Sequence, residues 1–411
     1  MYVERIPHFL QSTFSKHSSE FSRIGFNHFR ILIVALAINA RKGKLVHFAG
    51  AAPKHGHRTS HARFLISEWE AAGVIASGAW NTIQSMKPQA GEPIYLMIDD
   101  TRIKKRGKKM EGVSKIWDQK SHAFMHGHVV IMAAILFRGV SIPWAIDLWI
   151  PKAQAGKNYR KLNQIAAAMI NAFPSRFGLQ VRVLFDAAYL APPVIRACES
   201  KCFTWYSVAA RNRNLIRGNR KQKLKDIAPG ILRYSGKRVR MRRSRGWRWM
   251  RIASAEGELG RTGPVRIVFS KRSRHSNKEL LCVVSNELKQ TPREIISIYE
   301  KRWNIEVLFK ELRTSLGLCD YQVISRLAIV RYLHLCCAAH QMLTHQAIKD
   351  EGAQAQEKNK EVVLPSLNQR IDVFRQKVNK DRVTALLSRI RNEKVKRRIR
   401  QYLMHEAAVA A

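Results

Sequence analysis

Acidic side chains are scarce in this sequence. Asp and Glu together number 30 against 73 Lys and Arg in 411 residues, which leaves a formal net charge of +43. Self-repulsion on this scale destabilises a compact fold unless a polyanion is normally bound. The deficit of negative charge therefore indicates a nucleic-acid-binding protein, and a protein that binds membrane surfaces is a much weaker alternative.

Long apolar segments and a cysteine framework are also missing. The run Ile31–Ala37 is too short to cross a bilayer and is typical of a buried helix. Residues 1–20 have no apolar centre, so no secretory signal is expected. The six cysteines complete no disulfide or zinc pattern. We therefore expect a cytoplasmic, nucleoid-associated protein with reduced thiols and no membrane partner.

The apolar residues that are present suffice for a core, because 46% hydrophobic residues is ordinary for a globular protein. Apolar runs predict strands at 93–98, 129–137, 140–148, 181–185 and 203–209, with helices at 159–173 and 192–201. Gly139 between the second and third runs predicts a hairpin. Three strands followed by helix, strand, helix and strand is the order of an RNase H-like α/β domain.

The composition divides the chain further. Between residues 211 and 290, short strands persist among many Arg and Lys, which predicts a β-rich insertion into the α/β core. We expect five regions: 1–88, helical and a candidate for DNA binding; 89–210, the first part of the catalytic core; 211–290, the insertion; 291–350, the second part of the core; and 351–411, a basic helical region.

Two early helices at 31–48 and 59–72, joined by a stretch that contains Gly56, resemble a helix-turn-helix. Such a pair either reads DNA or only packs, and the sequence leaves both open. His122, His126 and His128 precede a strand without a matching acid, so structural or DNA-contacting roles are favoured over a metal site.

Polar side chains recur at helical spacing late in the chain. They are Tyr299, Arg302, Glu306, Lys310 and Arg313. If residues 294–316 form one helix, these five side chains fall within an arc of about 80°, beside an apolar stripe. A single carboxylate among cations and a phenol is unusual for a solvated face. The pattern suits a surface that holds a metal ion and grips phosphate oxygens.

Three carboxylates from distant segments are placed to converge. Asp100 and Asp186 each follow a predicted strand, and Glu306 lies on the polar helix. Ligands in open α/β sheets bind beyond the carboxyl ends of strands. Converging carboxylates repel unless a cation is bound, so we expect a metal-dependent site. Taken singly, a strand-end Asp is more often a turn residue and Glu306 a surface ion pair.

Together these motifs resemble the DDE transposases of bacterial insertion sequences. The motifs are Asp99-Asp100-Thr101, Asp186 and Tyr299-x2-Arg302-x3-Glu306-x6-Arg313. The closest match is the cut-and-paste branch that has a β-strand insertion before its last acid and a Tyr-Arg-Glu-Lys signature. The 120 positions between Asp186 and Glu306 leave room for that insertion. The likeness extends from about residue 94 to residue 345.

The resemblance implies that Asp100, Asp186 and Glu306 bind two Mg²⁺ ions, for which Mn²⁺ can substitute. Asp100 is preferred to Asp99 because the family's first acid directly precedes a Thr. The resemblance also implies double-stranded DNA as partner, both transposon ends and target, held by a homodimer in a synaptic complex. Tyr299 and Arg302 would then contact phosphates near the cleaved end.

Two further features leave alternatives open. The family's final Lys is Arg313 here, and Lys310 on the same stripe can share its role. Trp247 and Trp249 lie in a segment, 237–251, in which eight of fifteen residues are basic. They either stack on a base flipped from the transposon end, as the insertion does in related enzymes, or pack the insertion's own core.

The predicted activity is metal-dependent cleavage of insertion-sequence ends followed by strand transfer into target DNA. Two alternatives remain: a transposase-derived DNA-binding regulator, and a hydrolytic nuclease without strand transfer. The three acids and most of the signature residues that are expected to contact phosphate are present, and a role in binding alone does not require them.

Overall fold

The structure is a computed structural model of the chain. The structure describes residues 6–39, 45–52, 56–118, 122–243, 246–260, 262–272, 280–352 and 361–390, together with residues 393 and 395. The core is a five-stranded sheet in the spatial order β4-β3-β1-β5-β6. The bounds are β1 (Pro93–Lys104), β3 (Ala123–Phe137), β4 (Val140–Trp149), β5 (Gln180–Phe185) and β6 (Thr204–Val208).

Strand direction and connectivity confirm the predicted fold class. β1, β5 and β6 run parallel, whereas β3 is antiparallel to both β1 and β4. A meander of three strands followed by two parallel crossover strands is the RNase H-like arrangement expected from the sequence. A further strand, β2 (Ser114–Asp118), pairs with the first part of β3.

The β3–β4 hairpin turns at Arg138 and Gly139, as predicted, and both residues have positive φ values of 46° and 83°. Two positive φ values are what the twist of a tight hairpin requires, although Arg rarely adopts one. A buried ion pair holds Arg138 in place, because its guanidinium lies 2.7 Å from the carboxylate of Glu92. This pair fixes the edge of the sheet to the segment that precedes β1.

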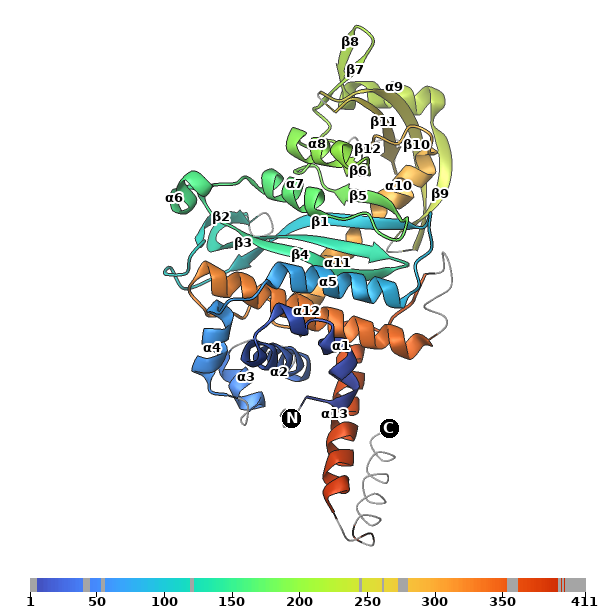
Figure 1. Cartoon of the computed structure of the whole chain (residues 1–411). Helices are drawn as coiled ribbons and strands as arrows, with labels where there is room; N and C mark the ends of the chain where they lie inside the picture. The colour runs from blue at the N-terminus through green and yellow to red at the C-terminus, as the bar shows by residue number, and fades with distance from the viewer. Residues whose placement is uncertain are drawn as a thin grey trace.

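The β-rich insertion continues the core sheet. Its elements are β7 (Asn214–Arg217), β8 (Arg220–Lys223), α9 (Leu224–Ser235), β9 (Lys237–Arg243), β10 (Gly246–Glu258), β11 (Pro264–Lys271) and β12 (Leu281–Ser285). β12 pairs antiparallel with β6, and β11, β10 and β9 follow it outward. The β9–β10 hairpin therefore curves away from the far end of the sheet, at the upper right in Figure 1.

Helices cover both faces of the core. α7 (Leu162–Ala172) and α8 (Pro192–Ser200) pack on one face, and α11 (Trp303–Ser315) packs on the other, against β1 and β4. α5 (Ala71–Ser85) and α12 (Arg326–Glu351) run along the edge strand β4 (Figure 1). The short α6 (Lys152–Ala155) and a 3₁₀ turn, η4 (Gly156–Asn158), precede α7.

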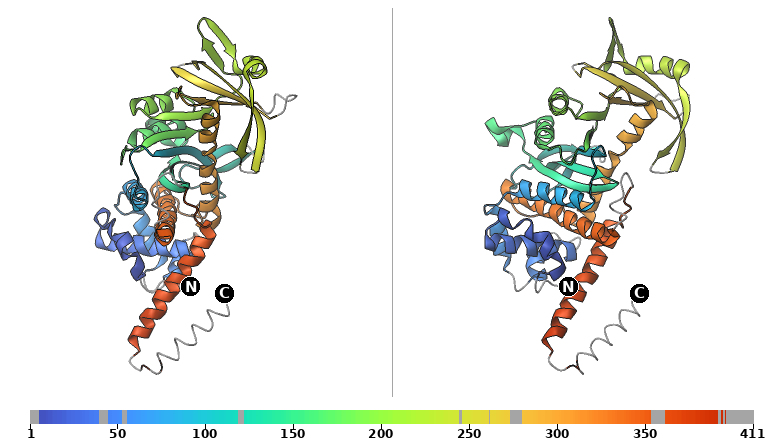
Figure 2. Two further views of the ribbon diagram at one scale, coloured as in Figure 1. Left: turned by 90° about the vertical axis from the view of Figure 1, so that its right-hand side faces the viewer. Right: turned by 45° about the vertical axis from the view of Figure 1, so that its right-hand side comes forward.

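The N-terminal helices form a group on the outer side of α12. They are η1 (His8–Leu10), α1 (Gln11–Ser15), η2 (Ser18–Glu20), α2 (Arg23–Asn39), α3 (Leu45–Ala51) and α4 (Arg58–Ile66). α13 (Leu367–Arg389) extends away from the body of the molecule, as Figure 2 shows from two sides. In the part of the chain that the structure describes, no helix has the length and apolar character that a membrane span needs.

The helix predicted at 59–72 differs from the observed one in two ways. α4 begins at Arg58 because the side chain of His57 accepts a hydrogen bond from the backbone N–H of Thr59, so His57 is the N-cap. The helix stops at Ile66, where the hydroxyl of Ser67 bonds back to the carbonyl of Phe64. Of the helix predicted at 31–48, residues 31–39 are helical within α2 and residues 45–48 are helical within α3, whereas residues 40–44 lie outside the described residues.

The single helix predicted at 294–316 is in fact two helices, α10 (Pro292–Glu300) and α11. Between them the backbone hydrogen bonds join residues three apart instead of four, from Arg302 N to Tyr299 O and from Ile305 N to Arg302 O. The side-chain amide of Asn304 also donates to the carbonyl of Lys301 at 2.8 Å. Asn competes in this way with helical hydrogen bonding, which explains a tight turn without Gly or Pro.

Candidate active site

The parallel pairing of β1 and β5 brings two of the sequence-predicted segments together. Ile98 is in register with Phe185, so the next residues, Asp99 and Asp186, lie side by side at the point where β5 ends. The strand predicted at 93–98 is longer than expected, because β1 continues through Asp99 to Lys104. Asp186 ends its strand because its carboxylate accepts the backbone N–H of Ala188 at 2.9 Å. Two carboxylates therefore stand close to the carboxyl end of β5, the kind of position at which ligands bind in open α/β sheets.

Asp99 and Asp100 point to opposite faces of the sheet, because successive side chains of a strand alternate. The odd-numbered neighbours of Asp99, such as Met97, pack in the same apolar cluster as α11. Ile98, by contrast, packs in the cluster that contains Tyr189. Accordingly, the hydroxyl of Tyr189 donates to the carboxylate of Asp100 at 2.9 Å, on the face away from α11.

The guanidinium of Arg302 joins β1 to α11. One of its nitrogens lies 2.9 Å from the carboxylate of Asp99, and the other lies 2.5 Å from that of Glu306. Glu306 is thus brought to the same face as Asp99, and a single cation bridges the two acids. The sequence led us to expect that Arg302 contacts phosphate; its contact with two acids was not anticipated.

The electrostatics of the acids reflect burial and mutual repulsion. Burial raises the pKa of Asp99 to about 7; Arg302 opposes the rise, and the charges of Asp186 and Asp100 add to it. Burial also raises the pKa of Asp100, against the hydrogen bond from Tyr189, while Asp186 again adds to the rise. Acids in this state favour a bound cation, because a cation relieves both the desolvation and the repulsion.

The other predicted site residues surround this cluster. Tyr299, at the end of α10, is mostly buried, and burial raises its pKa while Arg302 opposes the rise. Arg313 donates to the backbone carbonyl of Arg102 on β1 at 3.3 Å, which places it on the same face of the sheet. Lys310 is exposed on α11 and makes no side-chain ion pair among the described residues. It is therefore available to an approaching anion.

Trp247 and Trp249 do not pack a core. Their side chains are 55% and 52% exposed, so the alternative of an internal packing role is wrong. They lie on one face of the β9–β10 hairpin, where Arg240 and Arg238 of the paired strand lie over the respective rings at 5.4 and 4.8 Å. The hairpin thus presents alternating flat rings and guanidinium groups to solvent.

The structure gives a structural role to one of the three histidines singled out near β3. His128 is fully buried, accepts from the hydroxyl of Tyr321 at 2.6 Å and donates to the carbonyl of Glu111 at 3.0 Å. This agrees with the structural role favoured from the sequence. His122 and His126 are exposed.

A metal ion would suit the donors but not the present arrangement of side chains. Among the described residues, no three His, Cys, Asp or Glu side chains stand close enough to share an ion. The donors are nevertheless all carboxylate oxygens, which Mg²⁺ prefers. In addition, one buried oxygen of the neighbouring Asp100 has no hydrogen-bond partner within the described part of the chain. The guanidinium of Arg302 already places positive charge between Asp99 and Glu306, so a metal ion there requires that Arg302 turn aside.

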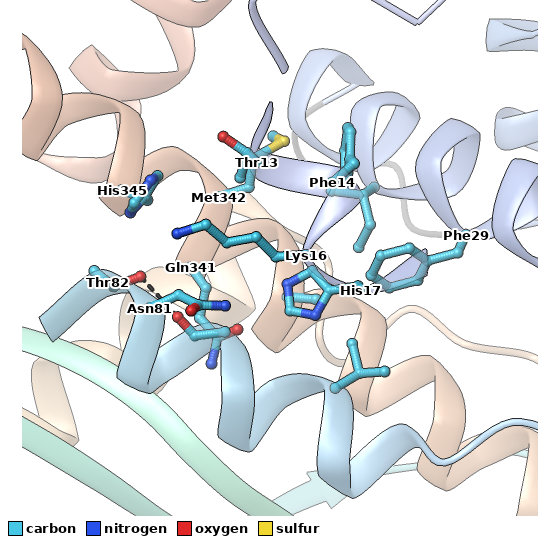
Figure 3. Close-up of a pocket in the computed structure, with 14 residues that line it drawn as sticks. Thr13, Phe14, Lys16, His17, Phe29, Asn81, Thr82, Gln341, Met342 and His345 are labelled. Carbon is cyan, nitrogen blue, oxygen red and sulfur yellow. Dashed lines mark hydrogen bonds between the residues drawn. The ribbon is translucent and has the colours of Figure 1, made fainter. Parts of the chain in front are cut away.

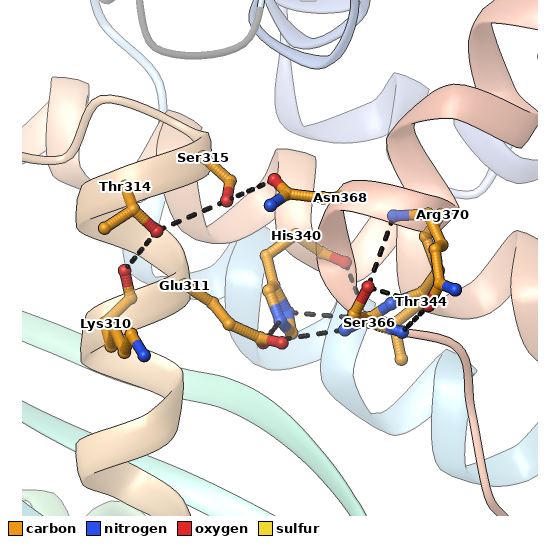
Figure 4. Close-up of polar contacts among 10 residues, drawn as sticks. Lys310, Glu311, Thr314, Ser315, His340, Thr344, Ser366, Asn368 and Arg370 are labelled. Carbon is orange, nitrogen blue, oxygen red and sulfur yellow. Dashed lines mark hydrogen bonds and ion pairs between the residues drawn. The ribbon is translucent and has the colours of Figure 1, made fainter.

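A second polar network fixes α11 from its other side (Figure 4). The carboxylate of Glu311 lies 3.4 Å from the imidazole of His340 on α12 and 3.5 Å from the guanidinium of Arg370 on α13. Arg370 also donates to the hydroxyl of Thr344 at 2.6 Å. Burial raises the pKa of Glu311, but the hydrogen bond with His340 and the charge of Arg370 outweigh it, so the pKa is lower than usual. Sequence reasoning missed this network, since Glu311 has the spacing of an ordinary helix residue.

Comparison with known proteins agrees with this geometry. Residues 91–342 match the family described as "Transposase DDE domain". A stretch of 169 residues is 27% identical to a protein of Microchaete diplosiphon described as "Probable transposase for insertion sequence element IS701". That alignment covers 40% of this chain and 43% of the relative, so the chain is matched over less than half the relative's length.

Proposed function

The chain belongs to the family of transposases with a DDE domain, and from this premise we propose that it cuts the ends of an insertion sequence and joins them to target DNA. The match confirms the resemblance to bacterial DDE transposases that was drawn from the sequence motifs. The observation that best supports the activity is that Arg302 bridges Asp99 and Glu306 while Asp186 lies beside Asp99, although these segments are far apart in the chain.

The proposed acidic triad differs from the one predicted from the sequence. Asp100 was preferred because it precedes Thr101, but its carboxylate bonds to Tyr189 on the face away from Glu306. Asp99 shares the face of Glu306 and stands next to Asp186. We therefore assign the first position of the triad to Asp99, with Asp100 as a neighbour that adds to the negative charge.

The family implies dependence on a divalent metal. We propose that Asp99, Asp186 and Glu306 hold two Mg²⁺ ions, with Mn²⁺ as a substitute. When bound, such ions supply a hydroxide-like nucleophile and neutralise charge on the leaving oxygen. The carboxylates position these ions and must be ionised, which a cation favours for an acid with the raised pKa of Asp99.

Cationic side chains around the acids would orient the DNA backbone. Arg302 can exchange its two carboxylates for a phosphate, because its planar guanidinium matches both groups in a bidentate manner. Lys310 is exposed on the same helix, and Arg313 is held close to β1 by the carbonyl of Arg102. Tyr299 adds a phenol within electrostatic range of Asp99 and Asp186.

The family also implies DNA as the partner. We propose double-stranded transposon ends and target DNA as substrates, bound by a homodimer because two ends must be cut together. The exposed Trp247 and Trp249 are placed to stack on unpaired bases, which aromatic rings between cations do well. This favours the base-stacking alternative over the packing one.

Strand transfer separates the proposal from its two rivals. The protein is incubated in Mg²⁺ with duplexes that carry the DNA flanking its gene, already cut to free the 3′-OH, and with a circular plasmid. A transposase joins the duplexes to the plasmid. A nuclease digests DNA without joining, and a regulator only binds it. Binding without any cleavage or joining would therefore contradict the proposed function.

A further inference from the structure

A small pocket lies where the N-terminal helices meet the catalytic core, far in sequence from the acidic residues. Its walls come from the α1–η2 segment, α2, α5 and α12 (Figure 3). One part is apolar, with Phe14, Phe29 and Met342. The other is polar, and the side chains of Lys16, His17 and His345 gather there, as Figure 3 shows. This combination of two histidines and a lysine is what makes the pocket unusual.

The basic groups at this pocket are close enough to influence one another. Lys16, Lys349 and His17 each lower the pKa of His345, after burial as the main cause, which takes it to about 4. Burial and Lys16 lower the pKa of His17 to about 4. Lys16 also lowers the pKa of Lys349, again after burial. Four basic side chains from two segments of the chain therefore converge.

Negative charge does not compensate for this gathering. Among the described residues that line the pocket there is no Asp or Glu. Asp350, which directly follows Lys349, is engaged elsewhere, because both of its carboxylate oxygens bond to Lys377 on α13. The like charges of Lys16 and Lys349 therefore act on each other, and such repulsion disfavours the folded state unless an anion joins them.

The deeper part of the pocket has an unused polar atom. His345 is only 5% exposed, and its Nδ1 has no hydrogen-bond partner among the described residues. A buried ring nitrogen without a partner costs free energy, so it calls for a ligand or a water molecule. Among the residues that the structure describes, His17 makes its hydrogen bond through Nδ1, in a 3.3 Å contact with the hydroxyl of Ser77. Asn81 and Thr13 add an amide and a hydroxyl to the lining.

We propose that this pocket binds a small oxyanion with the geometry of phosphate or sulfate, held by Lys16, His17 and His345, with Lys349 adding positive charge. A metal ion does not fit, because two lysines would repel it and no carboxylate is present to neutralise it. The lysines are exposed whereas the histidines are buried, so the charged groups stand nearest to solvent and the ring nitrogens lie deeper. This order suits an anion that enters from water.

The bound anion would join parts of the fold that are distant in sequence. Lys16 and His17 precede α2, whereas His345 and Lys349 lie near the end of α12. One oxyanion between them replaces repulsion by attraction, and so holds the N-terminal helices against the core. The bound oxyanion can come from two sources with the same chemistry, free phosphate and a phosphate of the DNA backbone. The inference does not depend on the proposed transposase activity.

The test is thermal unfolding of the full-length protein against phosphate concentration, at constant pH and ionic strength maintained with chloride. We expect a saturable rise in Tm, since a ligand that binds only the folded state stabilises it. Lys16→Met should raise the half-saturating phosphate concentration about tenfold or more, as expected for a lost charged hydrogen bond. Lys152→Met, on the distant α6, is the matched control and should behave as wild type.

Isothermal titration calorimetry with phosphate and with a short DNA duplex distinguishes the two sources. If backbone phosphate is the ligand, free phosphate competes with the duplex, and Lys16→Met weakens duplex binding more than Lys152→Met does. If free phosphate is the ligand, only the phosphate titration changes. Equal phosphate responses in wild type and Lys16→Met, or the same response to chloride alone, would overturn the proposed site.

Discussion

The guanidinium of Arg302 lies 2.9 Å from the carboxylate of Asp99, although the two residues are 203 positions apart in the chain. The same guanidinium bonds to Glu306 one helical turn further along α11. The basic residue that was expected to grip DNA therefore stands between two acids that were expected to bind metal. The guanidinium of Arg302 thus occupies the space that metal and phosphate would share.

Removal of Arg302 should consequently strengthen metal binding. In Arg302→Gln, Asp99 and Glu306 lose a competing cation, so we expect Mn²⁺ to bind about tenfold more tightly without DNA, in line with charged hydrogen bonds of this kind. DNA affinity should fall in the same variant. Calorimetric titration with Mn²⁺ measures the first effect. Lys310→Gln is the control, since it removes a cation that contacts neither acid, and it should weaken DNA binding alone.

The two adjacent aspartates should differ in their importance. Asp99→Asn should reduce cleavage of a DNA end by about 100-fold or more, because loss of a ligand costs more than the 10- to 100-fold typical of outer-shell changes. Asp100→Asn should retain more activity, since this side chain bonds to Tyr189 on the other face. Cleavage rates in Mg²⁺ compare the pair directly. Full activity in Asp99→Asn with none in Asp100→Asn would restore the assignment made from the sequence.

The exposed tryptophans should matter to DNA and not to folding. Because each side chain is more than half exposed, Trp247→Ala or Trp249→Ala should change the free energy of unfolding by no more than about 0.5 kcal/mol. Loss of a stacking platform should weaken binding to a DNA end with unpaired bases by about 1–3 kcal/mol.

Fluorescence anisotropy with such DNA, beside urea unfolding, measures both effects of the tryptophan variants. Tyr234→Ala is the control, because Tyr234 is an 84% exposed aromatic residue of the same insertion that lies on α9 and not on the hairpin itself. If the tryptophan variants bind DNA no more weakly than Tyr234→Ala, the hairpin is not a stacking surface.

Acid should destabilise the protein partly through His128. Burial lowers its pKa to about 4 from the ordinary 6.5, so the unfolded chain binds a proton that the folded protein does not. The contribution of His128 is therefore present above pH 6.5 and is lost as the pH falls from about 6.5 to about 4, at about 1.4 kcal/mol per unit of pKa difference. His128→Asn should show a shallower loss in urea unfolding over this range.

The exposed His126 on the same strand provides the control for that measurement, and His126→Asn should follow the wild-type profile. His17 and His345 titrate in the same direction and remain in both variants, so the difference between variants isolates His128. Parallel profiles for all three proteins would contradict the assignment of a neutral, buried His128.

Much of the fold could be predicted from the sequence. Uninterrupted apolar runs identified the buried strands. Gly139 identified the hairpin, because a tight turn needs a positive φ and glycine adopts one readily. The choice between Asp99 and Asp100 could not be made this way. The alternation of side chains along a strand shows that the two aspartates face opposite sides of the sheet. Only the packing of α11 shows which side holds Glu306. A side chain, Asn304, also ended a helix whose spacing looked continuous.

Cleavage by the triad variants tests the central claim most directly. Wild type, Asp186→Asn and Glu306→Gln are each incubated in Mg²⁺ with a duplex that contains the element's end, and nicking and binding are measured in the same samples. We predict that wild type nicks the end, whereas both variants bind it with unchanged affinity and leave it intact. Nicking by Glu306→Gln at the wild-type rate would show that the acids joined across β1, β5 and α11 are not the catalytic site.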